Sequence, residues 1–76
     1  MTHNMIALMC EIEKKTLYQM EIYRIEQKMY AVGTDSPLFE YLCIEQEHFK
    51  EKLASAERFC EYLINEINKE KENGCI

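Results

Sequence analysis

The residues best suited to chemistry in this chain are a glutamate and a histidine three positions apart, Glu45 and His48. Residues at this spacing lie on one face of a helix, so the carboxylate and the imidazole would point the same way. Both groups are common metal ligands. The pair is therefore a candidate metal site, and an ordinary solvated helix face is the alternative interpretation.

The four cysteines, at positions 10, 43, 60 and 75, are the other reactive side chains. They form no Cys-x-x-Cys pair and match no common zinc spacing. The N-terminus has no basic region typical of a secretory signal, so we expect a cytoplasmic protein with free thiols. Cys10 and Cys60 would lie at similar heights if the chain folds back on itself. Cys60 also suits a small core position, which is the simpler interpretation.

The elements that carry these residues are separated by a single break. The chain has two glycines and one proline, and Gly33 and Pro37 lie together between two long stretches free of helix breakers. Ser36 is a good N-cap and Pro37 suits the first helical position. The sequence therefore predicts a helix over about 4–32, a turn at 33–36, a helix over about 37–72 and a short tail at 73–76.

The second helix carries one sustained apolar seam at spacings of three and four, with Gln46 as its polar interruption. Its apolar members are Phe39, Leu42, Phe49, Leu53, Ala56, Cys60, Leu63 and Ile67. The first helix carries a matching stripe of Tyr18, Ile22, Ile25, Met29 and Val32. These two stripes are the predicted core of an antiparallel coiled-coil hairpin, with Gly33 as the left-handed residue after the first helix.

The first helix has a second apolar set on a different side: Met5, Met9, Ile12, Met20, Tyr23 and Tyr30. On the second helix, Tyr41, Phe59 and Tyr62 flank the main seam. A two-helix hairpin can cover only one stripe of each helix, so we expect these nine residues to form an interface. The predicted fold is all-α: a single-domain antiparallel hairpin over residues 1–76 that dimerises into a four-helix bundle.

The stretch from Ile44 to Phe49 resembles the metal-binding helix of ferritin-like carboxylate proteins, including short two-helix ferritins that dimerise to build their iron centre. Those proteins combine Glu-x-x-His pairs with further glutamates inside a four-helix bundle. The resemblance implies an iron or manganese site made of Glu45, His48 and a glutamate of the first helix. Antiparallel pairing places Glu21 at about the right level, and Glu26 is the next candidate. The resemblance covers only this segment and the hairpin layout.

Composition limits the remaining functions. The net charge is -5 at pH 7, which disfavours nucleic acid because affinity there depends on neutralising phosphates. The sequence has no glycine-rich phosphate loop and no nucleophile elbow, so we do not expect an enzyme. We expect a non-enzymatic helical interaction module without a cofactor, such as a phage or bacterial regulator that binds itself or another protein. The ferritin-like metal-binding dimer is the alternative, and an RNA-binding hairpin dimer is the third possibility.

Overall fold

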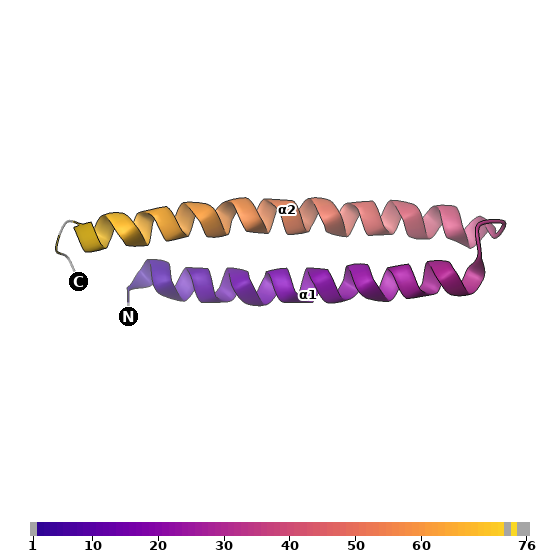
Figure 1. The fold of residues 1–76 in the computed structure, drawn as a ribbon, viewed down its shortest axis with the longest axis horizontal. Coiled ribbons are helices and arrows are strands. Elements are labelled where there is room, and N and C mark those ends of the chain that lie inside the picture. Colours follow the sequence, from indigo (N-terminus) through magenta and orange to yellow (C-terminus); the bar gives the residue numbers. More distant parts are fainter. Residues whose placement is uncertain (1, 73, 75–76) are drawn as a thin grey trace.

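The computed structural model of the protein describes residues 2–72 and 74 and contains two antiparallel helices, α1 (His3–Val32) and α2 (Pro37–Glu72) (Figure 1). The molecule is a rod with extents of 59 × 15 × 13 Å. The predicted all-helical hairpin is confirmed. The predicted tail at 73–76 lies outside the described residues, except for Gly74. Over the described residues, neither helix has a stretch long and apolar enough to cross a membrane.

Local hydrogen bonds explain where the helices begin and end. The Thr2 hydroxyl accepts from the Met5 amide at 3.3 Å and caps the start of α1. At the start of α2, the Ser36 hydroxyl accepts from the Leu38 amide at 3.2 Å, which confirms the predicted N-cap. At the end of α1, the Gly33 amide donates to the Met29 carbonyl at 3.1 Å. Each of these caps is a bond between residues no more than four apart in the chain.

Gly33 has φ 78° and ψ 163°, so it is not the left-handed helical residue that the sequence predicts. Its φ is positive, as predicted, but its ψ is extended. This combination is open almost only to glycine, because a Cβ would clash with its own backbone. The extended ψ redirects the chain from the axis of α1 toward the start of α2.

Gly33→Ala should lower the free energy of unfolding by about 1–3 kcal/mol, because alanine is strained at this backbone conformation. Since no neighbouring atom lies within 4 Å of a Cβ built at Gly33, the loss would come from the backbone and not from a clash. Thermal unfolding at one fixed protein concentration measures the effect. Thr34→Ala, at the exposed next position, is the control, and an equal midpoint for the two variants would contradict this account of the turn.

The core of the hairpin is supplied unequally by the two helices. The buried hydrophobic residues are Ile25, Leu42, Ala56, Cys60, Leu63 and Ile67. Of these, only Ile25 belongs to α1. The other residues predicted for the core are half-buried: Tyr18, Ile22, Met29, Val32, Phe39, Phe49 and Leu53. The contact between the two helices therefore buries five side chains of α2 and one side chain of α1.

Ile25→Ala should lower the free energy of unfolding by about 2–5 kcal/mol, because it opens a cavity at the best-covered position of α1. Ile25 is 2% exposed, whereas Ile44 on α2 is 68% exposed. Ile44→Ala is therefore the matched control and should change stability by less than about 1 kcal/mol. Urea unfolding checks both. Equal effects of the two variants would show that Ile25 is not a core residue.

Candidate interaction surface

The side of α1 that faces away from α2 carries a continuous exposed stripe. We call this stripe the outer face of α1, and it consists of Ile6, Met9, Glu13, Thr16, Met20, Tyr23, Gln27 and Tyr30. All eight residues are exposed, and their spacings alternate between three and four. Five of the eight are large and apolar, from Ile6 at 50% exposure to Tyr30 at 76%. This spacing is the pattern that packs against another helix.

The seam of α1, which faces α2, has the same spacing but a more polar composition in its first half. Its members, all buried or half-buried, are Asn4, Leu8, Glu11, Lys15, Tyr18, Ile22, Ile25, Met29 and Val32. The Asn4 amide donates to the Glu70 carboxylate across the hairpin at 2.8 Å. In the N-terminal half, α1 therefore turns charged and amide groups toward α2 while Ile6 and Met9 remain in solvent.

Glu11 and its neighbour Lys14 illustrate this arrangement. The Lys14 ammonium donates to the Glu11 carboxylate at 3.1 Å, and this hydrogen bond raises the pKa of Lys14. The Glu11 side chain is only 12% exposed, whereas that of Lys14 is 56% exposed. A charged group thus occupies a seam position that an ordinary amphipathic helix would fill with leucine.

The outer face is nearly free of charge. Its single charged member is Glu13, and Arg24 and Glu26 lie beside it on the helix surface. Arg24 pairs with Glu21 of the same helix at 3.2 Å. A hollow of about 500 Å³ crosses the outer face near its middle. The residues that line it are Thr16, Gln19, Met20, Tyr23, Arg24 and Gln27.

The nine residues predicted for the interface lie on more than one surface. Met9, Met20, Tyr23 and Tyr30 belong to the outer face of α1. Met5, half-buried, and Ile12, exposed, lie along one edge of that face. The remaining three are exposed on α2: Tyr41, Phe59 and Tyr62. On α2, the rings of Phe59 and Tyr62 contact each other with centroids 6.1 Å apart, and both remain exposed.

Two apolar residues near the outer face were missed by the sequence analysis. Ile6 is 50% exposed and belongs to the stripe, and Leu17 is 60% exposed beside it. The signal was present in the sequence: residue 6 begins the alternation of three and four that continues through positions 9, 13, 16 and 20. The apolar residues alone do not reveal this alternation, because the polar residues Glu13 and Thr16 occupy two of its positions.

The candidate metal ligands are not gathered within one hairpin. Glu45 is half-buried and His48 is exposed, and both line a shallow hollow of about 240 Å³ with Tyr41 and Ile44. The Glu21 carboxylate pairs with Arg24 of the same helix at 3.2 Å. Within the described residues no three His, Cys, Asp or Glu side chains are grouped to hold a metal ion. The ferritin-like alternative requires ligands from two chains, and it stays a prediction.

His48 is instead part of a small aromatic cluster around Phe49. The His48 ring meets Phe49 edge-on at 6.0 Å, and the Tyr18 ring lies 6.3 Å from Phe49 across the seam. The Lys52 ammonium sits 5.4 Å from the centre of the Phe49 ring. Of these contacts, the one between Tyr18 and Phe49 joins the two helices, and the other two lie within α2. His48 itself is exposed beside the seam.

The cysteines described by the structure are free. Cys10 is exposed, Cys43 is half-buried and Cys60 is buried. Cys60 lies in the seam of α2, and Cys10 lies on the solvent side of α1. The two thiols therefore lie on different sides of their helices, one in the seam and one toward solvent.

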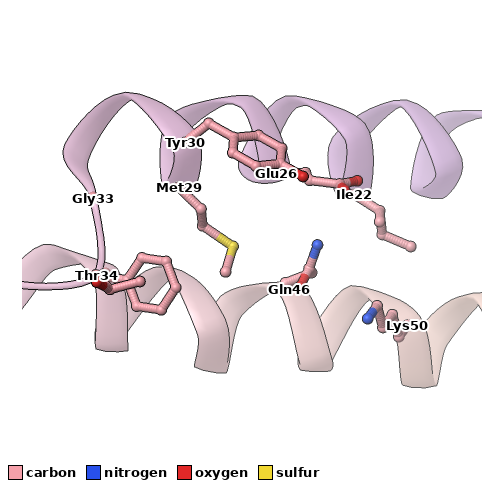
Figure 2. Close-up of a pocket in the computed structure, with 9 residues that line it drawn as sticks. Ile22, Glu26, Met29, Tyr30, Gly33, Thr34, Gln46 and Lys50 are labelled. Carbon is pink, nitrogen blue, oxygen red and sulfur yellow. The ribbon is translucent and has the colours of Figure 1, made fainter.

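A cavity of about 460 Å³ lies between the helices near the turn (Figure 2). Its apolar wall includes Ile22, Met29 and Phe39, and Gln46 extends from α2 toward α1 (Figure 2). Gln46 is the polar interruption of the seam predicted from the sequence. Gln46 thus places a polar amide between the apolar seam residues Leu42 and Phe49.

Comparisons of the chain with models of known protein families, with curated proteins and with solved structures found no match.

Lys15→Leu should raise the free energy of unfolding by about 1 kcal/mol, because it places an apolar side chain at a seam position beside Cys60. Lys28→Leu is the control, because Lys28 is exposed and lies outside the seam. Urea unfolding at matched protein concentrations compares the two. If Lys15→Leu is no more stable than Lys28→Leu, the N-terminal seam is not in contact with α2 as described.

Proposed function

We propose that the protein is a non-enzymatic helical interaction module that self-associates through the outer face of α1. The observation that carries the proposal is the exposure of five large apolar side chains at helix-packing spacing on a face with one charged residue. An apolar stripe of this length on a monomer is unusual unless another molecule covers it. A face with so little positive charge also offers nothing to phosphate groups, which argues against RNA there.

The exposed area of the hairpin supports the same conclusion. One chain exposes 5776 Å². A compact monomer of 9.1 kDa exposes roughly 4,900 Å² by the usual scaling of surface with mass. The surplus of roughly 900 Å² is comparable with the area of about 800 Å² that each partner buries in a standard protein interface. Covering one face of each hairpin would bring the exposed area per chain to that of an ordinary globular protein.

The position of the outer face favours a particular arrangement of four helices. In a square bundle, each helix contacts two neighbours that lie about a quarter turn apart around its surface. Here the outer face of α1 lies on the side opposite its seam with α2. Pairing two such faces gives a flattened row in which the two α1 helices lie inside and the two α2 helices lie outside. This arrangement explains why α1 is apolar on two sides and α2 mainly on one.

Met20→Asp should dissociate the assembly, because it replaces an apolar side chain at the middle of the outer face with a charge that association would remove from water. We expect the apparent dissociation constant to rise at least tenfold, as measured by size-exclusion chromatography with light scattering over a dilution series. Ile44→Asp on α2 is the matched control, since Ile44 is 68% exposed and Met20 is 56% exposed. Equal association of both variants and the unmodified chain would show that the outer face is not the interface.

A further inference from the structure

We infer that the molecule covering the outer face is a second copy of this chain, packed with its α1 antiparallel to the first α1 over their full length. In this arrangement, Glu13 of each copy enters the hollow of the other copy and meets Arg24 there. The inference rests on the proposed self-association and adds the direction and the register in which the two α1 helices pack.

Charge selects the antiparallel direction. If two α1 helices packed in parallel, Glu13 would face Glu13 and Arg24 would face Arg24, and both contacts would be repulsive. Antiparallel packing about a two-fold axis brings each glutamate beside the arginine of the other copy, and the symmetry repeats this pair at both ends. Like charges placed together in an interface cost several kcal/mol, whereas opposite charges set the direction and the register.

The length of the stripe selects the register. In the full-length antiparallel pairing, Ile6 faces Tyr30 of the second copy and Thr16 faces Met20. A shift by one heptad in either direction would leave one end of the stripe exposed, either Ile6 and Met9 or Tyr30. Only the unshifted pairing covers all five apolar residues, and this same pairing places Glu13 opposite Tyr23 and next to Arg24.

The hollow on the outer face fits the incoming residue. Met20, Tyr23, Arg24 and Gln27, which all line it, are spaced as the four residues that surround a side chain in knobs-into-holes packing. In the full-length register, the side chain that enters this hole is Glu13 of the second copy. The guanidinium of Arg24, the hydroxyl of Tyr23 and the amide of Gln27 are hydrogen-bond donors, which suit a carboxylate.

The test is a charge exchange measured by analytical ultracentrifugation on the full chain. Glu13→Arg and Arg24→Glu should each weaken association at least tenfold, because each variant brings like charges together twice per dimer. The double variant Glu13→Arg/Arg24→Glu should restore association to within about threefold of the unmodified chain, since the opposite charges meet again. Both positions are exposed in the single hairpin, so the helices should still form, which circular dichroism checks.

The matched controls are Glu51→Arg and Arg58→Glu, which make the same changes at exposed positions of α2. They should leave association within threefold of the unmodified chain. If the single variants behave like these controls, or if the double variant is as weak as the singles, the antiparallel register is wrong although self-association stands. If the unmodified chain is monomeric at every concentration, both the register and the proposed self-association are wrong.

Discussion

The structure depends on the limited contact that two helices can make with each other. A pair of helices shares one seam, so each can bury one stripe of side chains and leaves the rest of its surface in water. α2 has one main stripe, which supplies five of the six buried residues. Six of its large apolar side chains nevertheless remain exposed: Leu38, Tyr41, Ile44, Phe59, Tyr62 and Ile64. α1 has two stripes, and the one that faces α2 is the more polar in its N-terminal half, where Glu11 and Lys15 occupy seam positions. The exposed apolar side chains of α1 follow directly from this mismatch.

The second apolar stripe of α1, which α2 cannot cover, links the sequence of this helix to assembly of the protein. A helix that carries apolar residues on two sides is typical of the interior of a larger assembly, and the hairpin alone provides no interior for α1. Two hairpins joined through their α1 helices would provide one, with the polar N-terminal seam of α1 covered by its own α2. The seam would then tolerate Glu11 and Lys15 because the main apolar contact of α1 lies on its other side.

The sequence predicted the shape of the chain better than the details of its surfaces. The helices, the turn and the cap at Ser36 follow from local signals. Gly33, Ser36 and Pro37 lie close together between two long stretches that contain no helix breaker. The extended ψ of Gly33 did not follow, because the positive φ that glycine allows is compatible with several values of ψ. The polar seam of α1 was missed for a different reason: Asn4, Glu11 and Lys15 look like surface residues until the register with α2 is known. The predicted metal site needs ligands from two chains, whereas the structure contains one hairpin. Glu45 and His48 as metal ligands therefore stay a prediction.

Small-angle X-ray scattering of the unmodified chain at micromolar concentration tests the central claim most directly, because it gives mass and length together. A full-length antiparallel pair should have twice the 9.1 kDa mass of one chain while its longest dimension stays close to the 59 Å of the single hairpin. A mass of one chain would contradict the account, because the outer face of α1 would then be stable in water. A doubled mass with a much longer particle would contradict the full-length packing of α1 against α1.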